Sequence, residues 1–207
     1  MRVTDFNKDL NTSRANTRHS VVVRAIQEAF PGVLACIASH ETNDRLGVDV
    51  WLELAGQRPI GVDLKIRAKD YAAATGGPLD CVLELRDAGK CGWSTRASLC
   101  DWLLFVCTDT GRWAAFRHAD ILAVCTMWGD AFLNHPRCKR ITTRTASRFP
   151  HHYARDSLAV AVPADLLQKG NQRTERGGRW QQMTLNEPQV PCSRWMLARS
   201  VANGCAS

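Results

Sequence analysis

The chain has 207 residues, of which 45% are hydrophobic and 23% charged, a balance that fits one well-cored globular domain and leaves little room for two. No apolar run approaches the length of a membrane span, and the first residues lack the apolar core of a signal peptide. Nine cysteines, odd in number and scattered, argue against a secreted disulfide framework, so we expect a reducing, cytoplasmic setting.

The apolar pattern predicts helices and strands in a mixed order along the chain. Apolar residues between 16 and 30 recur at helical spacing and stop at a Pro-Gly pair, which predicts an amphipathic helix. The elements expected after it are strands over 33–38, 47–54, 60–66 and 81–85, a short helix over 94–100, strands over 102–107 and 113–116, a helix over 118–128, a strand over 157–162 and a short helix over 163–167.

The strands over 47–54 and 60–66 form the most informative part of the sequence. Apolar residues alternate with polar ones in both, and a polar turn separates them, so we expect a hairpin. Asp63 and Lys65 are two residues apart and therefore share a face, and the neighbouring strand can present Asp49 beside them. Two carboxylates that hold a divalent ion, with a lysine near the bound water, are typical of a phosphodiester-cleaving site.

Asp49 followed by Asp63-Leu64-Lys65 resembles the D…(D/E)-x-K signature of the restriction-endonuclease-like, PD-(D/E)xK nucleases, with Val48 in the place of the proline. The resemblance covers about residues 16 to 110. It implies an α-β-β-β-α-β core, that is, an α/β fold with a mixed central sheet and helices on both faces.

The same resemblance implies roles for particular residues. Asp49 and Asp63, with the backbone carbonyl of Leu64, would hold Mg²⁺ or Mn²⁺, and Lys65 would orient the attacking water or stabilise the developing charge. In this family a glutamate of the first helix often contacts the metal or water, which makes Glu28 the fourth candidate catalytic residue. The alternatives are a surface ion pair between the second acid and the lysine, and an ordinary helix-surface role for the glutamate.

Positive charge is concentrated in the last third of the chain. Residues 1–136 carry 15 Lys and Arg against 16 Asp and Glu, whereas residues 137–207 carry 12 against 4. We expect a nucleic-acid-binding surface there, formed by Lys139, Arg140, Arg144 and Arg148. The expected division is a nuclease-like domain over residues 1–168 and a basic extension over 169–207, whose first ten residues read as a loop.

The predicted function is therefore Mg²⁺-dependent hydrolysis of phosphodiester bonds in DNA by an endonuclease of phage, mobile-element or restriction origin. The sequence leaves the oligomeric state undecided, and a homodimer is one of the alternatives. One alternative is a non-catalytic nucleic-acid-binding or inhibitor protein on the same fold. Another is a metal-free interaction module whose basic third meets an acidic protein.

Overall fold

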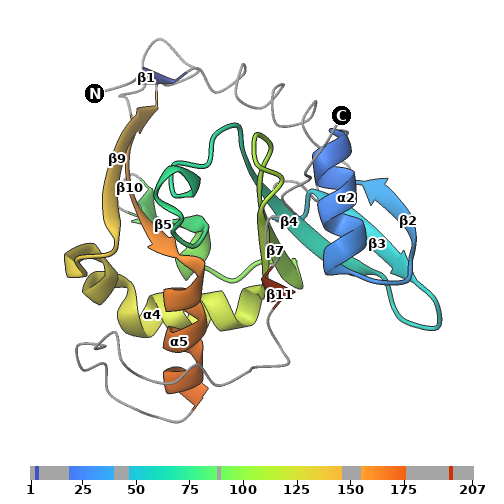
Figure 1. Cartoon of the computed structure of the whole chain (residues 1–207). Coiled ribbons are helices and arrows are strands. Elements are labelled where there is room, and N and C mark those ends of the chain that lie inside the picture. Colours follow the sequence, from blue (N-terminus) through green and yellow to red (C-terminus); the bar gives the residue numbers. More distant parts are fainter. Residues whose placement is uncertain are drawn as a thin grey trace, which may run out of the picture.

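The computed structural model describes residues 3–4, 19–39, 47–87, 90–145, 155–175 and 196–197. Within them the protein is a mixed α/β fold of two sheets and three α-helices, which confirms the predicted mixture of strands and helices (Figure 1). One sheet stands to each side in Figure 1, and α4 (His118–Asn134) runs beneath both. Among the described residues, no helix combines the length and the apolar character that crossing a bilayer requires.

The larger sheet carries the predicted hairpin and has six strands. They are β2 (Val33–Ala38), β3 (Val50–Leu54), β4 (Ile60–Arg67), β7 (Trp102–Cys107), β8 (Trp113–Arg117) and β11 (Met196–Leu197). Their order is β11-β8-β7-β4-β3-β2. β2, β3 and β4 form an antiparallel meander, and β4 pairs in parallel with β7. The apolar residues of β7 run without interruption because this strand lies inside the sheet and is buried on both faces.

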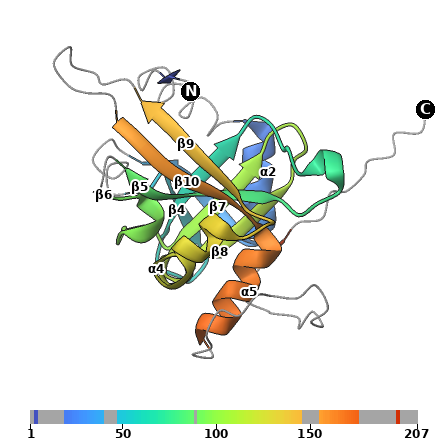
Figure 2. The same cartoon turned by 90° about the vertical axis from the view of Figure 1, so that its left-hand side faces the viewer.

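The smaller sheet joins the middle of the chain to its last third. Its strands are β1 (Val3–Thr4), β5 (Asp80–Asp87), β6 (Lys90–Cys91), β9 (Lys139–Thr145) and β10 (Arg155–Pro163). They lie in the order β1-β9-β10-β5-β6, and all pair antiparallel except β1 with β9. Figure 2 shows β9 and β10 side by side in front of the larger sheet.

Residues 68–101 form the crossover between the parallel strands β4 and β7. The resemblance implies an α-helix at this place, whereas the structure has β5, β6 and two short 3-10 turns, η1 (Ala73–Thr75) and η2 (Trp93–Thr95). The crossover therefore contributes strands β5 and β6 to the smaller sheet, where the resemblance implies a helix that covers the larger one. We name residues 68–79 the β4–β5 loop.

The two faces of the larger sheet are covered by different elements. α2 (Ser20–Ala29) packs on one face, against Val62 and Leu64 of β4. α4, β5 and β10 cover the other face with a separate apolar cluster. Asp63 and Lys65 alternate with the apolar pair, so they point to the side of α4 and β5, away from α2.

The helix predicted over residues 94–100 is wrong. The structure has the single turn η2 there, followed by irregular chain with bends. The side chains of Ser94 and Thr95 donate hydrogen bonds to backbone carbonyls of β5 and do not cap a helix, so the segment is bound to the neighbouring strand.

Two helices extend well beyond their predicted ends, and one strand is absent from the prediction. α4 continues to Asn134, beyond the expected end at 128. α5 (Ala164–Glu175) continues through residues predicted as a loop, so the expected boundary at 168 falls inside this helix. β9 lies where the sequence was interpreted only as a basic surface.

Candidate functional site

Asp49 lies directly before β3 and is bound to β4 through both its backbone and its side chain. Its N–H donates to the carbonyl of Val62 at 3.0 Å, and its Oδ2 accepts a hydrogen bond from the N–H of Leu64 at 2.6 Å. Its carboxyl group also hydrogen-bonds to that of Asp63, which is buried with 7% of its surface exposed. The hairpin thus brings the two predicted acids together, and they lie on one face.

The environment holds a proton on this pair of acids. Burial raises the pKa of Asp49 to about 7, and the charge of Asp63 acts in the same direction. The Leu64 N–H and the charge of Lys65 act against this rise but do not cancel it. Two carboxylates in contact and out of water cannot both ionise freely, so Asp49 keeps its proton up to about pH 7 when no cation is bound.

Lys65 joins the acids as predicted. Its Nζ lies 2.7 Å from Asp63 Oδ2 and 4.3 Å from the centre of the Trp93 ring, and 26% of its side chain is exposed. Glu84 of β5 is the next acid on this side. Burial raises its pKa, the charge of Asp87 raises it further, and the charge of Lys65 opposes the rise. The lysine is therefore oriented by an acid and an aromatic ring and still reaches solvent.

A pocket of about 370 Å³ opens onto Asp63. It is lined by Gly47, Asp63, Trp93, Arg96, Ala97, Ser98, Leu99 and His118. Gly47 has a φ of 82°, and a Cβ at this position would collide with Ser98 Oγ, so the pocket wall requires glycine there. A substrate can reach Asp63 through this opening.

His118 is a site residue that sequence reasoning missed. It is the first residue of α4, is buried, and its Nε2 has no hydrogen-bond partner among the described residues. Burial lowers the pKa of His118, while a hydrogen bond with the Trp93 backbone and the charge of Asp63 act to raise it. A single histidine at the start of a helix forms no motif with neighbouring residues in the sequence, so nothing in the sequence marks it as a site residue. It comes close to Asp63 only through the fold.

Glu28 is not brought to the acid pair. Its Oε2 accepts a hydrogen bond from Trp113 Nε1 at 2.7 Å, and its Oε1 lies 3.6 Å from Arg24 Nε. α2 covers the face of the sheet opposite to Asp63, so these contacts tie the helix to β8. The alternative of an ordinary helix-surface acid, here beside Arg24, describes Glu28 better than a contact with a metal at the acids.

The predicted nucleic-acid-binding residues are only partly described. Lys139 and Arg140 open β9, and both are exposed. Arg144 belongs to the same strand, and Arg148 lies outside the described residues. Arg137, two residues before β9, forms an ion pair with Asp165 at 2.8 Å, so its charge is neutralised within the fold.

The acid pair fits a divalent cation by its chemistry. Mg²⁺ takes oxygen ligands and commonly uses one or two carboxylates, with waters and substrate phosphate oxygens as the other ligands. A proton is held on Asp49 because two negative groups are buried together, and a cation would replace it by neutralising both. Within the described ranges, no three His, Cys, Asp or Glu side chains are placed to hold a metal ion, so backbone or substrate oxygens must complete the shell.

No family model, curated protein or solved structure matches this chain.

Proposed function

We propose that this protein is a metal-dependent nuclease that hydrolyses phosphodiester bonds in DNA as an endonuclease. The observation that carries the proposal is the arrangement of the motif residues: Asp49 bound to the backbone of β4, Asp63 in contact with it, and Lys65 2.7 Å from Asp63. Mg²⁺ or Mn²⁺ held by the two acids and the Leu64 carbonyl would polarise the phosphate and lower the pKa of a bound water.

The residues of the site divide the work of that reaction. The acids would hold the ion, and one strand of a substrate can approach Asp63 through the pocket. Lys65 is positioned by the Trp93 ring to donate a hydrogen bond to the attacking water or to the charge that develops on the phosphate. Buried walls on the α4 side reduce the screening of these charges by water.

Several coarser features support this proposal. The α2-β2-β3-β4 order and the parallel pairing of β4 with β7 fit the first part of the core that the motif resemblance implies. Exposed cations on β9 fit a polyanionic substrate. The cysteines among the described residues are all free, which fits the cytoplasmic setting that is part of this proposal.

The main alternative, a nucleic-acid-binding protein that does not cut, is favoured by one observation. Lys65 already pairs with Asp63, and the protonated carboxyl of Asp49 hydrogen-bonds to Asp63, so the three groups satisfy one another without an ion. In that case the motif would be a stabilising polar cluster.

Cleavage of plasmid DNA with Mg²⁺ or Mn²⁺, with and without EDTA, separates the two functions. Asp63→Asn keeps the size of the side chain and should reduce cleavage by about 100- to 1,000-fold. Glu53→Gln, which removes an exposed acid of β3, is the matched control and should cleave as the parent does. Metal-independent DNA binding without cleavage on duplex, single-stranded and branched DNA would establish the non-catalytic alternative.

A further inference from the structure

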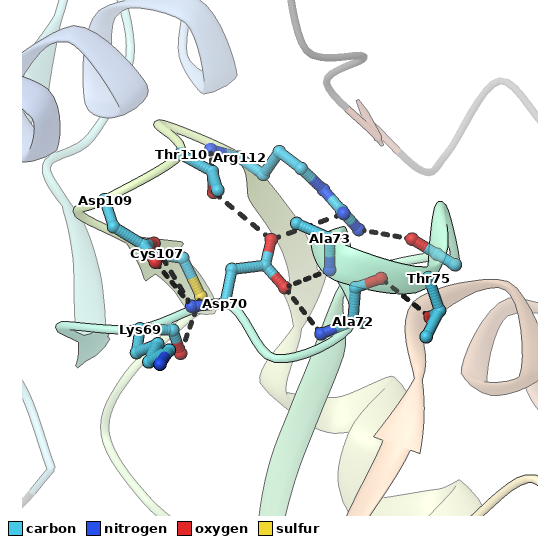
Figure 3. A network of polar contacts seen from close by, with 10 residues as sticks. Lys69, Asp70, Ala72, Ala73, Thr75, Cys107, Asp109, Thr110 and Arg112 are labelled. Atoms are coloured by element: carbon cyan, nitrogen blue, oxygen red, sulfur yellow. Dashed lines mark hydrogen bonds and ion pairs between the residues drawn. The ribbon is translucent and has the colours of Figure 1, made fainter.

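The β4–β5 loop is held in place by a buried carboxylate. The Asp70 side chain is 1% exposed, and its Oδ2 lies 3.3 Å from Arg112 Nη1 and accepts a hydrogen bond from Thr110 Oγ1 at 3.2 Å (Figure 3). Its Oδ1 accepts from the N–H groups of Ala72 and Ala73 at 3.1 and 3.2 Å. One acid therefore organises the loop and ties it to the turn between β7 and β8.

The same turn and its arginine hold the loop at two further points. Both carboxylate oxygens of Asp109 accept from the N–H of Asp70, at 3.1 and 3.0 Å. Arg112 Nη2 donates to the carbonyl of Gly77 at 2.8 Å (Figure 3). A loop of this Ala- and Gly-rich composition has little apolar material to bury, so these polar contacts are what give it a defined shape.

This framework presents two side chains outward, one on each side of the buried Asp70. Tyr71 has 65% of its surface exposed and is the only aromatic among the large exposed hydrophobic side chains of the described residues. Lys69, also exposed, places its Nζ 5.4 Å from the centre of the tyrosine ring. An exposed ring beside a cation, on a loop that is fixed from below, is a recognition surface and not a core element.

The loop continues a line of cations that begins at the candidate site. Asp63, Lys65 and Arg67 occupy alternate positions of β4, and each step of two residues spans roughly 6.6 Å at the usual strand rise. Beyond them lies Asp80, the first residue of β5. Burial raises its pKa, the charges of Arg67, Arg112 and Lys139 act against that rise, and the charge of Asp70 in the loop adds to it, so all four groups lie near this acid. The line therefore runs from the acid pair past the loop to the start of β9.

We propose that Lys69 and Tyr71, named here the stacking platform, bind an unpaired nucleotide of the strand that passes through the Asp49–Asp63 site. The base stacks on the tyrosine ring, and the lysine contacts the adjacent phosphate. The inference rests on the proposed function and narrows its substrate to DNA with a single-stranded segment beside the cut, because a paired base inside a duplex does not expose its face to a ring.

Binding measured in EDTA tests the platform without any cleavage. The probes are a single-stranded oligonucleotide with one 2-aminopurine moved along its length, and a blunt duplex of the same sequence. Tyr71→Ala should weaken binding of the single strand by about 5- to 100-fold, whereas Tyr71→Phe keeps the ring and should stay within about 2-fold of the parent. The duplex should bind the parent and both variants alike.

The position of the fluorescent base gives a second readout. One position should show fluorescence quenching by the parent and by Tyr71→Phe but not by Tyr71→Ala. Lys69→Gln should reduce the slope of log affinity against log salt by about one, and Lys90→Gln, at the far end of β5, should leave it unchanged.

The possible outcomes separate the platform from the nuclease. Equal single-strand affinity in the parent and Tyr71→Ala, together with metal-dependent cleavage, overturns the platform alone. Tyr71-dependent binding without cleavage under any metal condition supports the platform and overturns catalysis. Equal losses in Tyr71→Ala and Tyr71→Phe would show that the hydroxyl, and not the ring, makes the contact, which also overturns stacking.

Discussion

Asp49 Oδ2 accepts the backbone N–H of Leu64 at 2.6 Å, so the first acid of the motif is bound to the residue between the other two. The pairing of β3 with β4 ends at Val50 and Val62. Beyond that point the Asp49 carboxylate accepts the hydrogen bond that a backbone carbonyl of the neighbouring strand would otherwise accept. Removing this side chain would leave a strand N–H unpaired as well as removing a ligand. Substitution at Asp63 is therefore the cleaner test of catalysis, and Asp49→Asn, which keeps an acceptor, is the appropriate variant at the other position.

The stability of the metal-free protein should fall as pH rises from about 4 to about 7, as far as Asp49 contributes. In this window the folded protein keeps a proton on Asp49, because its pKa is raised to about 7, while the unfolded chain has already released it. Thermal unfolding in EDTA at about pH 5 and about pH 8 measures this difference.

The matched variant and the cation isolate the contribution of this acid. Asp49→Asn should flatten the pH dependence, and Mg²⁺ should raise the unfolding temperature of the parent more at about pH 8 than at about pH 5, because the ion competes with the proton. The same pH slope in the parent and the variant would contradict a proton held on Asp49.

Lys65→Met should lower the cleavage rate by about 100-fold or more while the affinity for DNA in EDTA changes by less than about 3-fold. The methionine keeps much of the apolar stem and removes only the charged end, which is the part that lies over the Trp93 ring. Single-turnover rates with saturating enzyme measure the chemical step. A loss of affinity that accounts for the whole effect would assign the lysine to binding.

Gly47→Ala should destabilise the protein more than Gly76→Ala does. Both glycines have positive φ, 82° and 65°, so both alanines carry the backbone strain of about 1 kcal/mol or more. Only at Gly47 does the new Cβ collide with a side chain, that of Ser98 in the pocket wall, while Gly76 has open space. Urea unfolding of the two variants measures the difference. Equal losses of unfolding free energy would show that Ser98 moves aside without an energetic cost.

Asp70→Ala should cost about 3–5 kcal/mol of unfolding free energy, because it leaves the largely buried guanidinium of Arg112 without its carboxylate partner and with only the Gly77 carbonyl. The double variant Asp70→Ala with Arg112→Met should recover part of that loss. Denaturant unfolding with an unchanged m-value provides the measurement. A double variant no more stable than Asp70→Ala would show that the carboxylate acts mainly through its backbone hydrogen bonds.

Replacing Lys139 and Arg140 together with alanine should weaken DNA binding and reduce the salt slope by about two, since each cation that contacts phosphate releases about one counterion. Both side chains are exposed, so the fold should be retained. Arg137→Ala is a poor control, because its partner Asp165 would be left alone. Unchanged affinity for DNA would assign this surface to an acidic protein instead.

Local pattern was sufficient for strands that are continuous apolar runs or that alternate without a break. β2 has the predicted bounds, and the hairpin of β3 and β4 places Asp49 beside Asp63 because strand alternation and turn chemistry both act over short distances. The ion pair between Asp63 and Lys65 follows from the same two-residue spacing.

Features set by distant contacts could not be read in this way. η2 replaces a helix because its Ser and Thr side chains bond to β5, and the position of His118 depends on how α4 crosses the sheet. Glu28 was assigned from its order in the chain, but the order does not say which face of the sheet a helix covers. The stacking platform could not be predicted because Lys69 and Tyr71 lie in a loop without a motif. Only the structure shows that Asp70 between them is buried and fixes both side chains outward.

The pairing of β5 with β10 has a consequence for how the protein is made. Asp80 at the start of β5 pairs with Pro163, roughly 80 residues later, so at ordinary rates of translation the ribosome delivers the partner strand about 4–16 s after β5. During that interval β5 has only the two-residue β6 along one edge, and its other edge exposes backbone groups that can pair with a second nascent chain. Slower growth at low temperature should therefore not by itself improve the soluble yield, whereas holding that strand edge covered until Pro163 has emerged should.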